Sequence, residues 1–498
     1  MVKNKGKIAQ IEGLTGKSTT FGELLQNSVR LALNMQEKGI EYGDIISICS
    51  NDNEDVPLTF IASLFLGVTV SALEPSFGLD DLINSLKQIC PKMIFVEPKI
   101  LEKIVEALTS NGLDCRIVVF GATERHTTFS DMIRPVDCEN DFRPVPVTSL
   151  LETAYIVFTS GTTGIPKTIR HNHHSVQYQY FSLIQKNFCW DMLLHYSTPF
   201  WTLYTQFLGI TIILGTTRVF YPTFYENYWD FVKYKITTAF FSVTEISTLC
   251  IHQRPKNLNL RGLKILIGGN VVHRNHLERI RTVFYDADLY VCYGFTEIPG
   301  TLTSFACKKT DWELKSVNPT SVGTGFPGIS YKVVDCVTEE ILGPNKVGEL
   351  RVKAQFPLGG YYKSHPISLW DSYGWLKTGD MVYYNDDRCF YVIDRVKHMF
   401  KYKDYHVVPR VLEEILESHP AVQRAAVVGV PNEEDGHHPL GFVVLKSSVE
   451  AVTSRILEDF VEQRVADYLR LRAGVKIVDK FPTTRTGKVR KWLLQERL

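Results

Sequence analysis

The stretch of sequence that decides the fold and the chemistry runs Tyr155-Ile156-Val157-Phe158-Thr159-Ser160-Gly161-Thr162-Thr163-Gly164-Ile165-Pro166-Lys167. Its apolar first half predicts a strand, and the small residues that follow predict a loop closed by proline and lysine. Glycines let backbone N–H groups approach phosphate oxygens, the hydroxyl groups add donors, and the lysine adds a positive charge. The GxxxxGK[ST] spacing of a Walker A loop is absent. From composition alone, a plain surface turn is the alternative to a phosphate loop of another kind.

Helix and strand patterns alternate on the N-terminal side of this loop. Residues 21–38 carry an apolar stripe at helical spacing, and residues 44–50, 92–96 and 116–120 are short apolar runs that predict strands. Residues 56–73 are uncharged and nearly long enough to span a bilayer, but they contain proline, glycine and hydroxyl side chains. We therefore expect a buried helix that runs into a buried strand, within parallel sheets covered by helices.

The pattern changes after about Gly323. Residues 331–335, 347–352, 381–384 and 389–393 are short strands separated by Gly, Asp and Asn, which predicts a small antiparallel or barrel-like unit.

A third pattern follows Asp394. A helix over residues 409–418, strands over 425–430 and 440–445, and a longer helix over 454–471 predict a small α+β domain.

The length of 498 residues exceeds what one hydrophobic core supports, so at least two domains are expected. The predicted fold class is α/β. Residues 1–394 form a large N-terminal domain with two helix-covered, parallel-type sheets and a β-barrel-like unit, and residues 395–498 form a small, mobile α+β C-terminal domain.

Charge and composition exclude several classes of protein. The net charge is +1, from 55 Lys and Arg against 54 Asp and Glu, which excludes a polyanion binder that relies on bulk charge. Aromatic residues make up 12%, too many for long disorder. We therefore expect a small-molecule partner, no nucleic acid and no integral membrane segment, while the sequence leaves the oligomeric state open.

Cysteine usage and the chain ends bear on location. The ten cysteines form no CxxC pair and fit a reducing compartment, so we expect a cytoplasmic protein. The N-terminus lacks the apolar segment of a signal peptide. The last residues, Glu496-Arg497-Leu498, share only Arg and Leu with a peroxisomal tripeptide and make a poor import signal.

Four further motifs follow the predicted phosphate loop in order: Tyr293-Gly294-Phe295-Thr296-Glu297; Trp375-Leu-Lys-Thr378-Gly379-Asp380; Asp394-Arg395-Val-Lys397 with Lys401 and Pro409; and Pro482-Thr-Thr-Arg-Thr486-Gly487-Lys488. Together the five motifs resemble those of the adenylate-forming superfamily, which includes acyl-CoA synthetases, 4-coumarate–CoA ligases and beetle luciferases. The resemblance extends from about residue 8 to the end, and residues 392–446 are most similar to the luciferase-like branch.

The resemblance implies a reaction in two halves: ATP and an acid give an acyl-adenylate and pyrophosphate, and coenzyme A then displaces AMP. It implies that the nucleotide is bound by Thr159, Ser160, Gly161, Thr162, Thr163, Gly164, Lys167, Gly269, Asn270, Tyr293, Gly294, Thr296, Asp380, Arg395 and Lys488. Within that set, the loop up to Lys167 holds the departing phosphates and Asp380 accepts hydrogen bonds from the ribose.

The resemblance also implies the catalytic residues Lys488, Lys401, Thr296 and Glu297. Thr296 contacts the α-phosphate, and Glu297 holds Mg²⁺, a hard cation that prefers carboxylate oxygens. Lys488 serves adenylation and Lys401 the second half-reaction, after the C-terminal domain swings about a hinge at Asp394 and Lys397.

The acyl pocket is predicted at Trp201, Gly268 and Asn270. A bulky indole and an amide favour an aromatic or short acid over a very long acyl chain. Packing in the hydrophobic core is the alternative for Trp201.

Two departures from the family pattern bear on the second half-reaction and the loop. Thr168 and Asp404 stand where the family usually has glycine, and an acidic side chain at Asp404 is expected to obstruct thiol entry.

Three functions therefore stay open: an acid–CoA ligase for aromatic, medium or fatty acids; a luciferase-type monooxygenase that uses a luciferin and O₂; and a degenerate nucleotide-binding homologue.

Histidines near the loop invite a metal interpretation. His171, His173 and His174 follow the loop, and His273 with His276 form HxxH, but no carboxylate accompanies them at the spacing of a zinc enzyme. We therefore expect no metal site at these histidines, and we predict a structural role behind the loop for His173.

Overall fold

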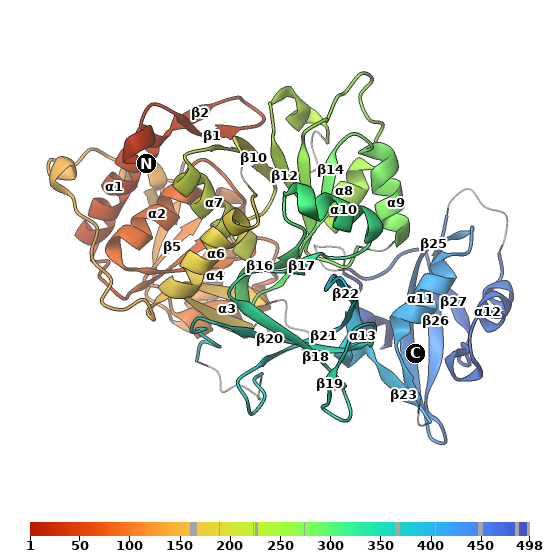
Figure 1. The fold of residues 1–498 in the computed structure, drawn as a ribbon. Coiled ribbons are helices and arrows are strands. Elements are labelled where there is room, and N and C mark those ends of the chain that lie inside the picture. The colour runs from red at the N-terminus through yellow and green to blue at the C-terminus, as the bar shows by residue number, and fades with distance from the viewer. Residues whose placement is uncertain are drawn as a thin grey trace.

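The computed structural model describes residues 1–159, 167–188, 190–222, 224, 228–272, 274–363, 369–403, 405–446, 452–483 and 488–495. Two seven-stranded sheets and a group of antiparallel strands build the N-terminal domain, and a smaller sheet with its own helices builds the C-terminal domain (Figure 1).

The first sheet has the strand order β7-β6-β5-β3-β4-β8-β9 and is parallel except for β9. Its strands are β3 (Ile45–Cys49), β4 (Thr69–Leu73), β5 (Met93–Val96), β6 (Arg116–Val119), β7 (Thr127–Thr128), β8 (Thr153–Thr159) and β9 (Lys167–Asn172). Its helices are α1 (Phe21–Glu37), α2 (Val56–Leu66), α3 (Leu79–Ile89), α4 (Leu101–Asn111) and α5 (Phe129–Met132). Successive strand residues enter opposite hydrophobic clusters, with Phe95 packing on the side of α1 and α2 and Val96 on the side of α3 and α4.

The second sheet has the order β14-β13-β12-β10-β11-β1-β2 and is parallel except for β2. Its strands are β1 (Ile8–Glu12), β2 (Ser18–Thr20), β10 (Met192–His195), β11 (Thr217–Phe220), β12 (Thr238–Ser242), β13 (Lys264–Gly268) and β14 (Asp288–Val291). The helices of this part are α6 (His173–Gln185), α7 (Thr202–Leu214), α8 (Val243–Leu249) and α9 (Arg274–Val283). These two sheets confirm the predicted pair of helix-covered, parallel-type sheets.

A buried ion pair joins the two sheets. Arg218 of β11 lies 2.8 Å from Asp52, which follows β3, and both side chains are almost fully buried. The guanidinium also donates to Gln10, and the Tyr204 hydroxyl donates to Asp52 at 3.0 Å. These hydrogen bonds satisfy a charge pair whose burial would otherwise be costly, so they fix one sheet against the other.

Antiparallel strands follow the second sheet. A three-stranded sheet contains β15 (Tyr293–Phe295), β16 (Ile298–Ser304) and β17 (Thr324–Gly325), and α10 (Lys309–Val317) lies between β16 and β17 in the chain. A five-stranded sheet has the order β19-β18-β20-β21-β22, built from β18 (Ile329–Val334), β19 (Ile341–Leu342), β20 (Gly348–Ala354), β21 (Leu376–Tyr384) and β22 (Phe390–Arg395). The four strands predicted after Gly323 are therefore β18, β20, β21 and β22, in an antiparallel sheet.

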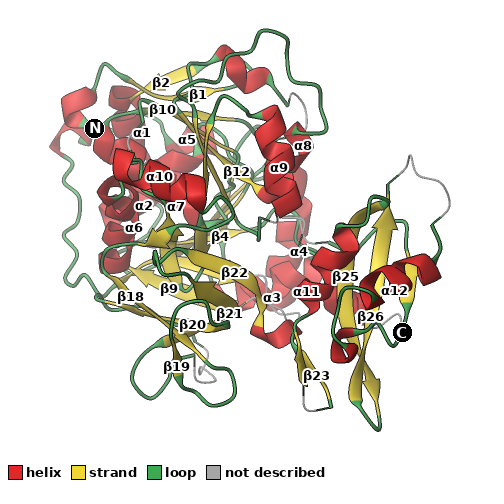
Figure 2. Cartoon of the chain, turned by 45° about the vertical axis from the view of Figure 1, so that its right-hand side comes forward, coloured by secondary structure: helices red, strands yellow, loops and turns green. Residues whose placement is uncertain are grey.

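The C-terminal part has its own sheet (Figure 2). Two hydrophobic clusters pack against it. Its strands are β23 (Phe400–Tyr402), β24 (Tyr405–Val407), β25 (Val422–Asn432), β26 (Gly436–Leu445) and β27 (Val475–Ile477), and its helices are α11 (Pro409–Glu417), α12 (Ser454–Glu462) and α13 (Lys491–Gln495). Short 3₁₀ helices cover Val2–Asn4, Pro98–Ile100, Glu139–Asp141, Asp230–Lys233, Val396–His398 and Asp467–Leu469. The exact boundary at residues 394 and 395 stays a prediction.

One predicted element is wrong in length. The helix expected over residues 454–471 ends at Glu462, and a 3₁₀ turn, Asp467–Leu469, follows it. Ala466 has extended backbone, which lets Tyr468, Leu469 and Leu471 pack against the C-terminal cluster. Tertiary packing therefore overrides the helical spacing of the apolar residues.

The uncharged segment over residues 56–73 is a helix followed by a strand, α2 and β4, as predicted, and nine of the residues of α2 are buried in the fold. In the part of the chain that the structure describes, every helix is too short or too polar to cross a bilayer.

Candidate active site

The predicted phosphate loop connects two paired strands. β8 and β9 are antiparallel neighbours, with Thr159 opposite Lys167 at the end of the hairpin that the loop connects. The loop residues Ser160, Gly161, Thr162, Thr163 and Gly164 lie outside the described residues. The structure thus shows where the loop begins and ends, and Lys167 is its first described residue on the return strand.

Lys167 lies beside an aromatic ring that the sequence had not singled out. Its Nζ is 5.6 Å from the centre of the Tyr361 ring, a favourable place for a cation. Tyr361 pairs with Ile169 of β9, so its position is fixed by backbone contacts. The preceding residues Gly359 and Gly360 were the available signal, because a Cβ on Gly359 would come within 2.2 Å of the Arg170 carbonyl oxygen.

Thr168, which departs from the family glycine, is buried in the same region. Its hydroxyl lies 3.2 Å from Gln88 Oε1 and 3.1 Å from the Tyr362 carbonyl oxygen. The substitution therefore joins β9 to α3 and to the segment that holds Tyr361.

Asp380 is the centre of the best-defined cluster. It lies in β21, is 5% exposed, and accepts a hydrogen bond from the Tyr293 hydroxyl at 2.6 Å. Arg395, directly opposite in β22, places Nη1 at 2.8 Å from Asp380 Oδ1. Burial raises the pKa of Tyr293 well above its usual value, and the Asp380 charge raises it further. Tyr293 therefore stays a hydrogen-bond donor, and the Asp380 carboxylate is held in one place.

Glu297 lies at the turn between β15 and β16, next to Thr296. Burial raises the pKa of Glu297 and the Asp380 charge adds to this effect, while Arg395 and Lys167 oppose it. Glu297 and Tyr361 line the same small cavity of about 10 Å³. A half-buried, partly desolvated carboxylate of this kind gains from a nearby cation, and carboxylate oxygen suits Mg²⁺.

The described part of the site holds no ready-made protein metal centre. Among the described residues, no group of three or more His, Cys, Asp or Glu side chains is arranged to hold a metal ion. The donor set fits Mg²⁺ only as a cation shared between Glu297, phosphate oxygens and water, which is the usual mode of this ion.

His171 of β9 contacts the backbone of Thr296. It is 2% exposed, and burial lowers its pKa to about 4, while a hydrogen bond with the Thr296 backbone works in the opposite direction. His171 is therefore a neutral side chain that fixes the start of the Thr296–Glu297 turn.

Lys488 reaches this site from the C-terminal domain. Although its side chain is exposed, the surrounding protein partly withdraws the ammonium group from water. This desolvation lowers the pKa of Lys488, the Arg395 charge lowers it further, and Asp380 opposes the shift. Desolvation also lowers the pKa of Lys397 to about 8, with Arg395 and Lys488 adding to the effect. The structure thus brings Lys488, Lys397, Arg395 and Asp380 together.

Lys401 does not belong to this cluster. It is exposed on β23, where it pairs with His406 across a two-stranded hairpin. Asp404 lies outside the described residues.

The predicted hinge is tied to the C-terminal helices. Asp394 Oδ1 accepts from the Arg395 backbone and lies 2.7 Å from His398 Nδ1. Lys491 of α13 lies 3.9 Å from Asp394 and 2.6 Å from Glu413 of α11. Burial alone would raise the pKa of Asp394, but His398 and Lys491 hold it below its usual value. The junction is therefore held by charge pairs.

The predicted acyl-pocket residues lie at the end of β13 and at the start of α7. Gly268 ends β13 and a Cβ there would come within 3.2 Å of the Cys292 carbonyl oxygen, while Gly269 has a φ of +83°. Asn270 is half-buried and accepts a hydrogen bond from the Val271 backbone. Trp201 precedes α7 and packs with Phe200 at 5.1 Å in the cluster beneath α3 and α4, which is the core-packing alternative.

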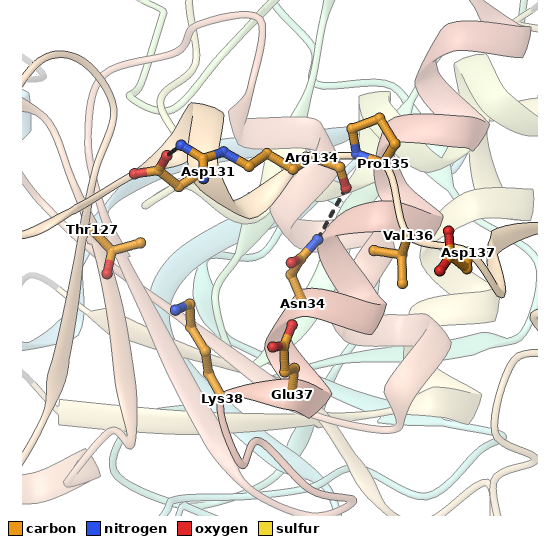
Figure 3. A pocket seen from close by; sticks show the side chains of 9 residues that line it. All are labelled: Asn34, Glu37, Lys38, Thr127, Asp131, Arg134, Pro135, Val136 and Asp137. Atoms are coloured by element: carbon orange, nitrogen blue, oxygen red, sulfur yellow. Dashed lines mark hydrogen bonds and ion pairs between the residues drawn. The ribbon is translucent and has the colours of Figure 1, made fainter.

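A surface hollow of about 640 Å³ lies elsewhere (Figure 3). Its lining comes from the end of α1 and the segment after β6, including Asn34, Lys38 and Arg134. These residues belong to none of the five motifs, so this hollow is not the candidate active site.

Comparison with known proteins identifies the family of this chain. Residues 2–362 match the family model of the AMP-binding enzymes, and residues 411–488 match that of the AMP-binding enzyme C-terminal domain. Similar proteins include a luciferin 4-monooxygenase of Photuris pensylvanica, 28% identical over 99% of this chain and 92% of its own length. Another is 4-coumarate–CoA ligase-like 9 of Arabidopsis thaliana, 30% identical over 96% of this chain and 85% of its own.

Solved structures of other proteins share the fold of this chain. The luciferase-like enzyme from the nonluminescent mealworm Zophobas morio is 34% identical, with a TM-score of 0.75 over 80% of this chain and 94% of its own. ATP-bound MatB from Rhodopseudomonas palustris shares the fold, with a TM-score of 0.85 and 19% identity over 100% of this chain and 96% of its own. With both family models matched in order, this chain belongs to the ATP-dependent, adenylate-forming superfamily of AMP-binding enzymes, in its luciferase-like branch.

Proposed function

We propose that this chain is an AMP-forming acid–thiol ligase, which activates a carboxylic acid with ATP and Mg²⁺ and passes the acyl group to coenzyme A. One observation carries the proposal. Lys488 of the C-terminal domain meets Asp380 of the N-terminal domain and Arg395 at the predicted domain boundary, and the Asp380 and Arg395 charges also act on Glu297. Such convergence from three separate motifs is expected of a site for a polyphosphate and an anionic acid.

The first half-reaction joins two anions. A carboxylate oxygen of the acid forms a bond to the α-phosphorus of ATP, the bond to the bridging oxygen breaks, and pyrophosphate leaves. Positive charge from Lys167, Arg395 and Lys488 offsets the repulsion between the reactants, and fixed positions lower the entropic cost of bringing them together.

The other motif residues orient the nucleotide. Asp380, fixed by Tyr293 and Arg395, accepts hydrogen bonds from the ribose hydroxyls. Thr296 donates to the α-phosphate from the turn that His171 supports. Glu297 would hold Mg²⁺, which neutralises phosphate charge when it is bound.

The second half-reaction needs a thiol. The sulfur of coenzyme A forms a bond to the acyl carbon, the thiol loses its proton, and AMP leaves. We propose that Lys401 faces the site in this half, after the C-terminal domain has rotated about Asp394 and Lys397. The substrate that we propose is an aromatic, medium or fatty acid.

A luciferase-type monooxygenase is the second candidate. It would adenylate a luciferin and let O₂, rather than thiol, react with the activated acid. The similarity to the Photuris luciferin 4-monooxygenase over nearly the whole chain favours it, as does the acidic Asp404 in place of glycine. A degenerate homologue without turnover is disfavoured, because Lys167, Glu297, Asp380, Arg395 and Lys488 are all present.

An acid panel separates these functions. Acid-dependent exchange of pyrophosphate into ATP is the expected result, and silence across a broad panel would favour the degenerate homologue. For each acid that supports exchange, AMP release and thioester are measured with and without coenzyme A. Thioester that appears only with coenzyme A selects the ligase, whereas light from a luciferin without thioester selects the monooxygenase.

A further inference from the structure

Tyr361 contacts two charged residues of the candidate active site at separate places on its side chain. The Lys167 ammonium lies over the ring, with Nζ 5.6 Å from the ring centre. The hydroxyl shares a hydrogen bond with the Glu297 carboxylate. A tyrosine keeps its proton at neutral pH and an ionised carboxylate can only accept, so the hydroxyl is the donor. One half-buried side chain therefore touches both the lysine that closes the phosphate loop and the proposed Mg²⁺ ligand.

Backbone hydrogen bonds on both sides of Tyr361 fix the point from which its side chain starts. The Arg170 N–H donates to the Gly360 carbonyl oxygen at 2.8 Å, and the Tyr362 N–H donates to the Thr168 carbonyl oxygen at 2.9 Å. Arg170 and Thr168 both belong to β9, so this segment is paired with the first sheet. The tyrosine is therefore mounted on the strand that carries the phosphate lysine.

The space around the contact with Glu297 is too small for bulk water. The cavity there measures about 10 Å³. Its lining residues are Ile169, Glu297, Gly360, Tyr361, Leu369 and Trp370. A volume of this size holds about one water molecule. On this side of the carboxylate, solvent therefore competes little with the tyrosine hydroxyl.

We propose that Tyr361 is a positioning residue of the nucleotide site. Its hydroxyl orients the Glu297 carboxylate for the Mg²⁺ ion that accompanies ATP, and its ring keeps the Lys167 ammonium beside the end of the phosphate loop. Each of the two opposite charges thus has its own contact on one side chain. This proposal rests on the adenylating function and adds to that site a residue that acts through two others.

The two contacts have different expected effects. A carboxylate that ligates a metal ion is usually held by a hydrogen bond, and loss of such a partner costs about 10- to 100-fold in metal affinity. An aromatic ring beside an exposed lysine contributes less, and its loss weakens a site by about two- to fivefold. The hydroxyl and the ring can therefore be separated by experiment.

The test measures ATP binding by calorimetry without acid, once with Mg²⁺ in excess and once with EDTA. The quotient of the two Kd values is the metal gain. In Tyr361→Phe, which loses only the hydroxyl, we expect the metal gain to fall by at least about tenfold while the Kd in EDTA stays within about twofold of wild type. Tyr361→Leu, which also loses the ring, should in addition weaken ATP binding in EDTA by about two- to fivefold.

Tyr362→Phe is the matched control, because it removes the same hydroxyl one residue along the chain. It should keep the wild-type metal gain. Glu297→Gln gives the gain that is left without the carboxylate, and adding Tyr361→Phe to it should lower the gain no further, since the tyrosine acts through Glu297. A tyrosine with a merely structural role would weaken ATP binding with and without Mg²⁺ alike.

An unchanged metal gain in Tyr361→Phe overturns the proposal, as does a further loss when this change is added to Glu297→Gln. Because Tyr361→Leu also lacks the hydroxyl, the gain can be measured on whichever of the two variants folds. Wild-type protein that binds ATP equally well with Mg²⁺ and with EDTA overturns the proposal without any variant. Acid-dependent pyrophosphate exchange by the wild-type protein tests the adenylating function separately, and its absence overturns that function whatever the metal gain.

Discussion

At the scale of single residues, the chemistry depends on how Asp380 is held. Two donors from different strands meet at its carboxylate, the Tyr293 hydroxyl and the Arg395 guanidinium. Because the Arg395 side chain is 43% exposed, solvent screens the ion pair, and its contribution to stability is small. Its main effect is geometric, since it fixes the two oxygens that are proposed to bind the ribose.

Asp380→Asn tests this role. The change keeps the shape but removes the charge, and hydrogen bonds to charged groups are worth about 1.5–3 kcal/mol. We expect the KM for ATP to rise by roughly 10- to 100-fold in pyrophosphate exchange. Tyr293→Phe is the milder comparison, because it removes one donor and leaves the carboxylate charged. An ATP KM that stays at the wild-type value in Asp380→Asn would remove Asp380 from the nucleotide site.

At the scale of elements, the strand β9 links the phosphate loop to the Thr296–Glu297 turn. It begins at Lys167, next to the phosphate loop, and ends near His171, which supports Thr296. Burial lowers the pKa of His171 from 6.5 to about 4, so the folded protein binds a proton at this site less readily than the unfolded chain. Stability is therefore lost as the pH falls from 6.5 towards 4, because the unfolded chain takes up the proton first.

The acid sensitivity of β9 can be measured directly. The shift corresponds to a loss of about 3 kcal/mol by pH 4. We expect the apparent unfolding temperature to fall between pH 6.5 and pH 4.5, and His171→Gln to flatten part of that fall. The rest should persist, because burial also lowers the pKa of His195, to about 3. The exposed His252→Gln serves as control, and a variant at His171 with the full wild-type slope would contradict the assignment.

Local patterns predicted most elements, and the error is informative. The helix α1 follows from its apolar stripe and its Thr20 capping box, both of which are local. The helix expected over residues 454–471 was too long, because Leu469 and Leu471 satisfy a helical period and yet pack through a 3₁₀ turn. That choice depends on the cluster around β25 and β26, which no local window contains.

In the candidate site, too, local motifs could be predicted from the sequence, whereas contacts between distant segments could not. Motifs identified the charged residues, because spacing along the chain marks them. The partners of β9 in the segment at Tyr361 and Tyr362 were missed, since Tyr361 pairs with Ile169 and the Tyr362 carbonyl contacts Thr168 from 194 residues further along the chain.

At the scale of the whole molecule, the C-terminal domain presents one of two lysines to the site. Lys488 lies near Asp380 and Arg395, while Lys401 is exposed on β23. This arrangement suits the first half-reaction, and the charge pairs of Asp394 and Lys491 hold it at the junction. A rotation about the junction would exchange the two lysines.

Reciprocal variants test that exchange. We expect Lys488→Ala to slow adenylate formation by more than about 100-fold while thioester formation from supplied acyl-adenylate is kept, because one preorganised charge in the transition state is worth about 10²–10³ in rate. Lys401→Ala should slow only the thioester step. Lys480→Ala, an exposed lysine of the same segment, is the control for both. Equal losses in both steps for either variant would contradict separate roles.

The central claim is that the carboxylate of an acid attacks the innermost phosphorus of ATP at this site. The most direct measurement is mass spectrometry of the nucleotide product after turnover with acid labelled by ¹⁸O in its carboxyl group. We predict AMP that carries one labelled oxygen, because the attacking oxygen stays on phosphorus when the acyl group departs. Unlabelled AMP, or ADP as the product, would contradict the account.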